Sequence, residues 1–113
     1  MPVTNPTTNA LPTGYGTTVG TTSGPVLPAN PTRGGLVFYN PSLSVILAVC
    51  PAVVNLAVLG SYSGNATGVA VLYGAGSIVL NPGDKFIIDN LMCSGAWNGI
   101  ASGPGGVLTV LEH

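Results

Sequence analysis

Glycine and proline interrupt this chain so often that few stretches are long enough to form a helix. Among 113 residues there are 17 glycines and 10 prolines, and these two residue types are the least tolerated in a helix interior. Between them lie short apolar runs that are rich in β-branched residues. Such runs separated by turn residues are typical of short strands. The sequence therefore predicts an all-β fold, and its length suits one domain.

The apolar runs after residue 32 predict about eight short strands, separated by turns at intervals of roughly ten residues. The clearest turn signals are Asn40-Pro41, Asn81-Pro82-Gly83-Asp84 and Gly103-Pro104-Gly105-Gly106. The expected strands cover residues 35–39, 43–49, 53–59, 69–73, 77–80, 85–89, 96–101 and 107–111. This pattern favours a single antiparallel β-sandwich or jelly-roll-like domain over residues 32–113.

The first 31 residues have a different composition, because Thr, Pro, Gly and Asn dominate and no charge is present. Isolated apolar residues in such a segment cannot build a core of their own. We therefore expect residues 1–31 to form an extended N-terminal arm, ordered by contacts with neighbouring subunits or, as the alternative, by wrapping around its own domain. The residues expected to make the assembly contacts are Val3, Leu11, Tyr15, Val19 and Leu27.

Charged side chains are almost absent from the sequence. The five that occur are Arg33, Asp84, Lys85, Asp89 and Glu112, with a formal net charge of -1. An average soluble domain carries charge on about a quarter of its residues. Two basic residues cannot neutralise a phosphate backbone, which excludes nucleic acid as a partner. A surface this poor in charge is better suited to contact with other protein, so we expect a homo-oligomer or a larger assembly.

The same scarcity leaves little material for catalysis. The single histidine is His113, so no Ser, Thr or Cys nucleophile has an expected base. Asp84 and Asp89 lie at the two ends of one expected strand, ~17 Å apart at strand rise, which is too far for a glycosidase pair. We interpret them as a turn cap and a strand end. No catalytic, cofactor-binding or metal-binding residue is expected, and the chain is expected not to be an enzyme.

The two cysteines and the longest apolar stretch have structural interpretations. Cys50 and Cys93 form either one disulfide or, as we favour, two reduced and buried thiols. Residues 43–59 carry no charge, but Pro51 divides them, and the stretch is at the short limit for a membrane span. It is interpreted as two strands, and no membrane partner is expected.

Arg33 stands at the junction between the expected arm and the expected domain. With so few charges in the chain, it has three candidate environments. It pairs with Glu112 or Asp89 within the chain, it pairs across a subunit interface, or it is an ordinary solvated charge.

Three stretches, taken in order, carry a resemblance. They are residues 33–42 (RGGLVFYNPS), residues 76–83 (GSIVLNPG), and residues 96–102 (AWNGIAS) with 107–112 (VLTVLE). Their order and spacing resemble a family of small virion proteins of tailed bacteriophages and prophages. The resemblance implies a small β-sandwich that acts as a head decoration, fibre or tail accessory component without catalysis. The uncharged segment 1–31 and the apolar run 53–59 depart from the family pattern.

From these features we expect a structural virion protein, a capsid decoration or cement component that oligomerises, with a trimer favoured. Its partners would be the major capsid protein or other virion proteins, and it would pass from the bacterial host cytoplasm into the particle. The alternative is a carbohydrate-binding adhesin or tail-fibre tip module. That alternative places Trp97 and a tyrosine on an exposed rim, whereas a lone tryptophan in a β domain is more often a core anchor.

Overall fold

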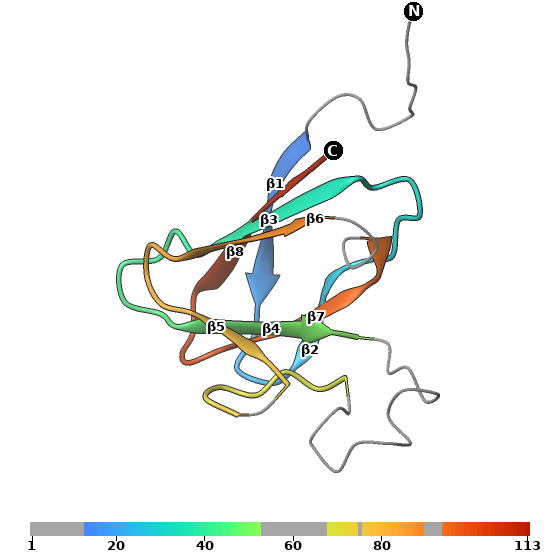
Figure 1. Cartoon of the computed structure of the whole chain (residues 1–113). Coiled ribbons are helices and arrows are strands. Elements are labelled where there is room, and N and C mark those ends of the chain that lie inside the picture. The colour runs from blue at the N-terminus through green and yellow to red at the C-terminus, as the bar shows by residue number, and fades with distance from the viewer. Residues whose placement is uncertain (1–12, 53–67, 75, 90–93) are drawn as a thin grey trace, which may run out of the picture.

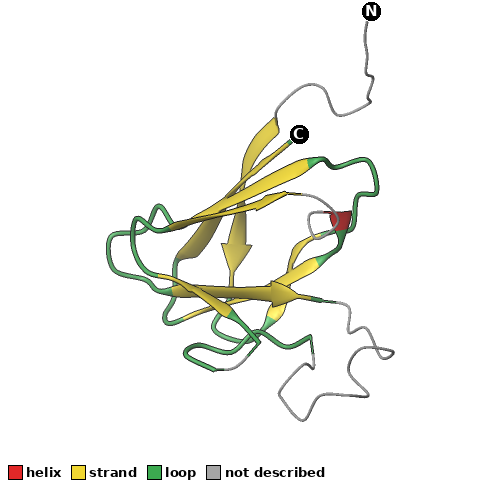
Figure 2. Ribbon diagram, in the orientation of Figure 1, coloured by secondary structure: helices red, strands yellow, loops and turns green. Residues whose placement is uncertain are grey.

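The short apolar runs of the sequence pair into two sheets that face each other (Figure 1). The computed structural model describes residues 13–52, 68–74, 76–89 and 94–113. Its strands are β1 (Thr13–Val19), β2 (Gly24–Leu27), β3 (Gly35–Tyr39), β4 (Leu47–Pro51), β5 (Ile78–Leu80), β6 (Lys85–Asp89), β7 (Trp97–Ala101) and β8 (Gly106–Glu112). Sheet A has the order β1-β8-β3-β6, and sheet B has the order β2-β7-β4-β5. All neighbours are antiparallel, and the expected all-β sandwich is confirmed (Figure 2).

Most strands after residue 32 lie where the turn signals predict them. The expected strands 35–39 and 85–89 coincide with β3 and β6. β5 and β7 each begin one residue later than expected, and β8 is one residue longer than expected at each end. The sequence identifies these strands because each is a short apolar run bounded by turn residues.

The strand expected at 43–49 begins later, at Leu47, where β4 starts. The preceding segment is shaped by a serine. The Ser42 hydroxyl accepts the N–H groups of Ser44 at 3.1 Å and Val45 at 2.9 Å. Such local side-chain bonds compete with strand pairing and turn the chain before β4.

The prediction of a strand at residues 69–73 is wrong. The described residues 68–74 contain no strand, and Tyr73 has a left-handed φ of 58°, which interrupts an extended chain. The expected strand 53–59 lies outside the described residues. No helix of the described part of the chain is long and apolar enough to cross a membrane.

Two strands of the sandwich lie within the expected arm. β1 pairs along its whole length with β8, and β2 pairs with β7. Residues 13–27 therefore belong to the sheets, and the expected boundary at residue 31 does not separate an arm from a domain. The composition did not indicate β1, because its outward positions are Gly14, Gly16 and Thr18. With these residues the strand resembles a low-complexity segment.

The core lies between the sheets and is centred on two aromatic rings. Phe38 of β3 and Trp97 of β7 meet edge to face, with ring centroids 5.2 Å apart and an interplanar angle of 68°. Trp97 is buried, so its predicted role as a core anchor is confirmed. The other members are Val19, Val26, Leu27, Leu36, Leu47, Val49, Leu80, Ile88, Ala101, Leu108 and Val110.

A buried asparagine joins two connections at one end of the sandwich. The Asn40 side-chain amide donates to the carbonyls of Val45 and Leu80, both at 2.8 Å, and its Oδ1 accepts the Ser42 N–H at 3.0 Å. Because each polar atom of this fully buried side chain has a partner, burial carries no penalty for an unmade hydrogen bond. Asn40 therefore links the end of β3 to the segment before β4 and to β5.

The turn between β5 and β6 carries the chain from sheet B to sheet A. The Asp84 N–H donates to the Asn81 carbonyl at 2.9 Å, and Gly83 has a φ of 87°. A positive φ at the third residue makes this a type II turn, which favours glycine there. The Asp84 carboxylate accepts the Asn81 N–H at 2.9 Å, which confirms its expected role as a turn cap.

Candidate functional site

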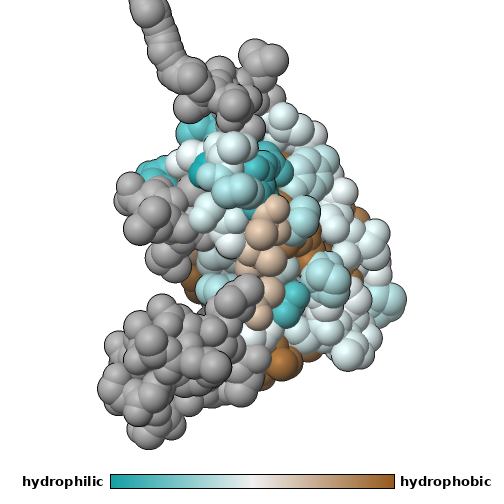
Figure 3. Space-filling view, turned by 90° about the vertical axis from the view of Figure 1, so that its right-hand side faces the viewer, coloured by the Kyte–Doolittle hydropathy of each residue, from teal (hydrophilic) through white to brown (hydrophobic). Residues whose placement is uncertain are grey.

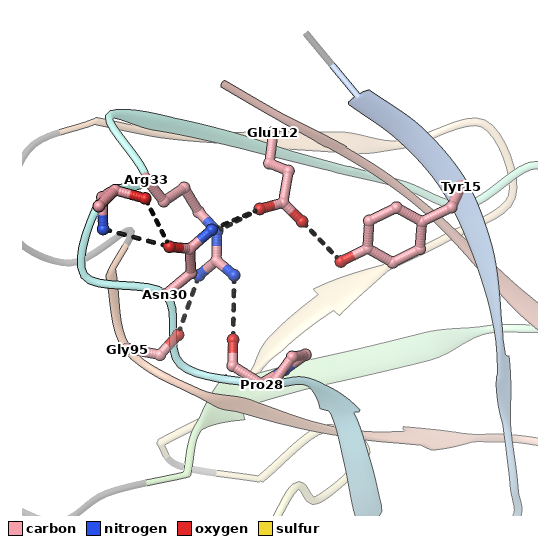
Figure 4. Close-up of polar contacts among 7 residues, drawn as sticks. Tyr15, Pro28, Asn30, Arg33, Gly95 and Glu112 are labelled. Atoms are coloured by element: carbon pink, nitrogen blue, oxygen red, sulfur yellow. Dashed lines mark hydrogen bonds and ion pairs between the residues drawn. The ribbon is translucent and has the colours of Figure 1, made fainter. Parts of the chain in front are cut away.

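The densest polar cluster of the described residues surrounds a buried ion pair (Figure 4). Arg33 precedes β3, and Glu112 ends β8. The Arg33 Nε lies 3.1 Å from the Glu112 Oε1, with side-chain exposures of 1% and 15%. The expected pairing of Arg33 with Glu112 is thus found within one chain. Asp89, the other expected candidate, is exposed on β6.

Both terminal nitrogens of the Arg33 guanidinium donate to backbone carbonyls. Nη1 donates to the Gly95 carbonyl at 3.2 Å and Nη2 to the Pro28 carbonyl at 2.9 Å. Pro28 follows β2 and Gly95 precedes β7, both in sheet B, whereas β3 and β8 belong to sheet A. A buried charge is tolerated only when it is paired and hydrogen-bonded, and Arg33 meets both conditions. The side chain therefore fastens the two sheets together.

The Glu112 carboxylate is held by two further donors. The Tyr15 hydroxyl of β1 donates to Oε2 at 2.8 Å, and the Asn30 side-chain amide donates to Oε1 at 3.3 Å. Burial raises the pKa of Glu112, but hydrogen bonds from Tyr15 and Arg33 outweigh that effect and leave it below its ordinary value. Glu112 is therefore an ionised structural anchor, not a proton donor at neutral pH.

We call the residues joined by these bonds the Arg33 cluster. Its members are Tyr15, Pro28, Asn30, Arg33, Gly95 and Glu112. The backbone beside it is also fixed, because the N–H groups of Gly34 and Gly35 both donate to the His113 carbonyl. The charged groups of the cluster are occupied by internal partners. Its evident chemistry is structural: it holds β1, β8 and the β2–β3 connection in place.

Raising the pH from 10 to 12 is expected to destabilise the fold through Tyr15. The pKa of Tyr15 is raised from 10.0 to about 12. Burial is the largest cause, followed by the hydrogen bond to Glu112 and by the negative charge of Glu112. The phenol therefore stays neutral in the folded state where it would ionise in the unfolded chain. Its stabilising contribution is complete below pH 10 and is lost as the pH rises through the folded-state pKa of about 12.

The measurement is the urea midpoint of unfolding as a function of pH. Between pH 10 and 12 the midpoint of the wild type should fall more steeply than that of Tyr15→Phe. Tyr73→Phe, which removes an exposed phenol, is the matched control. Equal slopes for the wild type and Tyr15→Phe would contradict the role assigned to Tyr15.

The expected assembly contacts of residues 1–31 are placed differently by the structure. Val19 and Leu27 are 3% and 1% exposed and face the core of their own chain, so they are not available to a neighbour. Tyr15 is half-buried in the Arg33 cluster. Val3 and Leu11 lie outside the described residues. The sequence interpretation failed for Val19 and Leu27 because it treated β1 and β2 as parts of an arm.

The thiol of Cys50 is free and buried in β4. Burial raises its pKa, against a smaller opposing effect of a hydrogen bond with Ser77. Since the thiolate is the reactive form, this cysteine is a poor nucleophile at neutral pH. Its state agrees with the expected reduced, buried thiol, and Cys93 lies outside the described residues.

The outer face of sheet A carries exposed apolar side chains that the sequence interpretation did not single out. Leu111 of β8 pairs with Val37 of β3, and Val37 pairs with Ile87 of β6. Ile87 and Leu111 are 61% and 47% exposed, and Val37 is half-buried between them. We call these three residues the outer apolar row. The sequence carries a sign of this row in Lys85–Asp89 and Gly106–Glu112. In both strands apolar residues occupy outward-facing positions as well as core-facing ones.

Other apolar residues extend this face. Val107 of β8 and Tyr39 of β3 point to the same side as the row and are 41% and 37% exposed. In the view of Figure 3, the described surface is mostly pale, with brown patches and limited teal areas. The described residues on the side seen in Figure 3 are thus weakly polar where an ordinary soluble domain would be charged.

Comparison with known proteins provides no relative of this chain. No protein-family model, curated protein or solved structure matches it. Within the described residues, no three His, Cys, Asp or Glu side chains gather where they could hold a metal ion. The features that bear on function are therefore the Arg33 cluster, the outer face of sheet A and the distribution of the few charges.

Proposed function

We propose that this chain is a non-enzymatic structural protein of a bacteriophage virion. It acts as a capsid decoration or cement component that oligomerises and binds the particle surface. Its partners are the major capsid protein or other virion proteins, and it enters the particle from the host cytoplasm. The resemblance of residues 33–42, 76–83 and 96–112 to small virion proteins suggests the setting, and the surface chemistry supports the role.

The observation that carries this proposal is the outer apolar face of sheet A. Leu111, Val37 and Ile87 form a row across three neighbouring strands, Tyr39 lies beside Val37 on β3, and Val107 lies on the same face further along β8, beyond Thr109. Contiguous apolar surface of this kind marks sites of protein contact on soluble proteins. Burial of such surface contributes about 25 cal/mol per Å², which supplies the driving force for binding to a particle.

The positions of the charges support the same role. Arg33 and Glu112 neutralise each other inside the protein, and Asp84 caps a turn. Asp84 is nevertheless exposed, as are Lys85 and Asp89 at the two ends of β6, so the exposed charges lie on one short segment. A protein with so little exposed charge gains little from remaining dispersed in solvent, and a large binding partner covers its weakly polar surface.

The structural role is favoured over the carbohydrate-binding alternative by the position of Trp97. A sugar site of the expected kind needs an exposed tryptophan face. Trp97 is only 1% exposed, and its ring packs on Phe38. We therefore propose only the structural role.

The test is the composition of particles made by a strain that carries this gene. Density-banded particles should contain the chain in a fixed ratio to the major capsid protein. Chymotryptic peptides are the better readout for mass spectrometry, because trypsin can cut only at Arg33 and Lys85. Absence of the chain from purified particles, while it is abundant in the lysate, would overturn the proposal.

A pair of variants tests whether the outer face makes the contact. Leu111→Asp places a charge in the outer apolar row and should abolish binding to particles that lack the chain. Leu43→Asp makes the same change at a 97% exposed leucine outside the sheets and should bind like the wild type. Equal binding by the two variants would show that another surface is used.

A further inference from the structure

We propose that β6 pairs with β6 of a second copy of this chain, antiparallel, about a two-fold axis at Ile87. The pairing joins two copies of sheet A, edge to edge, into one continuous sheet. This inference rests on the proposed assembly role, since it names the first partner of the assembling surface. It replaces the three-fold symmetry expected from the sequence by a two-fold contact.

β6 is an edge strand of sheet A. Among the described residues it pairs only with β3. An unprotected edge strand presents a row of unpaired N–H and C=O groups, which are a template for pairing with another chain. A five-residue strand with an exposed isoleucine at its centre has no bulge or proline that would block such pairing.

The hydrogen-bond pattern identifies which backbone groups face outward. The Asn40 N–H donates to the Asp84 carbonyl, and Gly35 exchanges hydrogen bonds with His113 on the other side of β3. Because bonding alternates along antiparallel strands, Phe86 and Ile88 must bond to β3. The N–H and C=O groups of Lys85, Ile87 and Asp89 therefore point to the free edge.

The charges on this edge are self-complementary in an antiparallel pairing. When Ile87 lies opposite the partner's Ile87, Lys85 lies opposite the partner's Asp89, and Asp89 lies opposite the partner's Lys85. Neither side chain has an ion-pair partner among the described residues of its own chain. A shift of the pairing by two residues leaves both charges unmatched, so the charges select one register.

In this register the residues whose side chains lie on the outer face of sheet A are also the residues whose backbone groups bond to the partner. Lys85, Ile87 and Asp89 of one copy exchange N–H···O=C bonds in both directions with the matching residues of the other. The same three side chains project from the outer face of sheet A, while Phe86 and Ile88 remain on the core side.

The two-fold axis also continues the outer apolar row into the second copy. The row runs Leu111, Val37, Ile87 in one copy and then continues through the partner's Ile87, the partner's Val37 and the partner's Leu111. Two short apolar rows become one row across the joined sheets. The dimer thus presents to a particle a single apolar surface twice as long as that of one chain.

The test is the mass of the purified full-length chain, measured by sedimentation equilibrium over a concentration series. The wild type should reach twice the chain mass of 11.2 kDa. Lys85→Asp places carboxylates opposite each other at both ends of the paired strands, and Asp89→Lys places two ammonium groups there. Each single variant should remain a monomer at concentrations where the wild type is a dimer.

Two rescues make this result specific. The double variant Lys85→Asp with Asp89→Lys restores opposite charges in the same register and should dimerise again. An equimolar mixture of the two single variants should form a heterodimer, because one chain then carries two acidic and the other two basic side chains. Thr18→Asp, which adds a charge at the opposite edge of sheet A on β1, is the matched control and should dimerise like the wild type.

Amide hydrogen exchange provides a second readout that does not depend on charge. The amides of Phe86 and Ile88 should be protected at all concentrations, because they bond to β3. The amide of Ile87 should become protected only as the dimer forms. Concentration-independent exchange at Ile87 in a dimeric sample would place the interface elsewhere and overturn the proposal.

The other outcomes are equally decisive. A wild type that stays monomeric, or forms a trimer, overturns the two-fold pairing, and so does a dimer that Lys85→Asp leaves intact. None of these results bears on whether the chain is found in particles, which is measured separately. A chain absent from particles but dimeric through β6 would overturn the virion role and leave the pairing standing.

Discussion

Deleting residues 1–31 is expected to yield a chain that does not fold into the sandwich. The deletion removes β1 and β2, an edge strand of each sheet, and leaves one side of β8 and of β7 without its partner. It also removes the core side chains of Val19, Val26 and Leu27. Burial of each contributes about 1.5–3 kcal/mol, so the loss is comparable with the ~5–15 kcal/mol that stabilises a small domain.

The measurement is cooperative unfolding followed by Trp97 fluorescence and circular dichroism. The shortened chain should show no transition, and Trp97 should emit as a solvated indole. A deletion of residues 1–12 is the matched control, because it removes no described strand, and it should unfold cooperatively. A sharp transition in the chain that lacks residues 1–31 would show that β3 to β8 form a stable sandwich without β1 and β2.

The shorter deletion also tests whether residues 1–12 make assembly contacts, separately from whether β1 and β2 are needed for folding. If residues 1–12, with Val3 and Leu11, make assembly contacts, their removal should weaken particle binding while the sandwich remains folded. If binding is unchanged, the contact belongs to the sheets alone. The longer deletion cannot answer this question, because it also removes strands.

Replacing Arg33 by methionine is expected to lower the free energy of unfolding by about 3–5 kcal/mol. The substitution preserves much of the side-chain length but leaves the Glu112 carboxylate with its charge unpaired in a partly buried site. The carbonyls of Pro28 and Gly95 lose their donors at the same time. A buried charge without its partner costs more than the pair contributes, and this asymmetry produces the large effect.

Urea unfolding of Arg33→Met provides the measurement, at a concentration low enough for the chain to be a monomer, with Lys85→Met as the matched control. Lys85 is the other cation of the chain and is exposed, so its loss should change stability by no more than about 0.5 kcal/mol. Adding Glu112→Leu to Arg33→Met should recover part of the loss, because the unpaired carboxylate is removed. An Arg33→Met chain as stable as the control would mean that the Arg33 cluster contributes little to the fold.

The sequence predicted those parts of the fold that depend on local chemistry. β3 and β6 were located because each is a short apolar run that ends at a turn signal. The turn at 81–84 was located by proline and glycine at its centre, and the positive φ of Gly83 then decides its type. The burial of Trp97 followed from the usual place of a lone tryptophan in a β domain.

The sequence could not show the features that depend on pairing over long distances. β1 has the composition of a loop, and it becomes a strand only because β8 lies beside it. The choice of Glu112 over Asp89 as the partner of Arg33 follows from the strand register, which places Glu112 on the core side of sheet A and Asp89 on the outer side. The outer apolar row is likewise assembled from three strands, and it exists only once the register is known.

The order in which the strands are synthesised has a consequence for when this protein can associate. β8 is made after all the other described strands, yet it lies between β1 and β3 in sheet A. While the ribosome is still translating residues 106–112, β1 has no neighbour and the Leu111 end of the outer apolar row does not exist. The central position of sheet A is therefore filled last among the described strands, and the outer apolar row spans three strands only once residues 106–112 have been made.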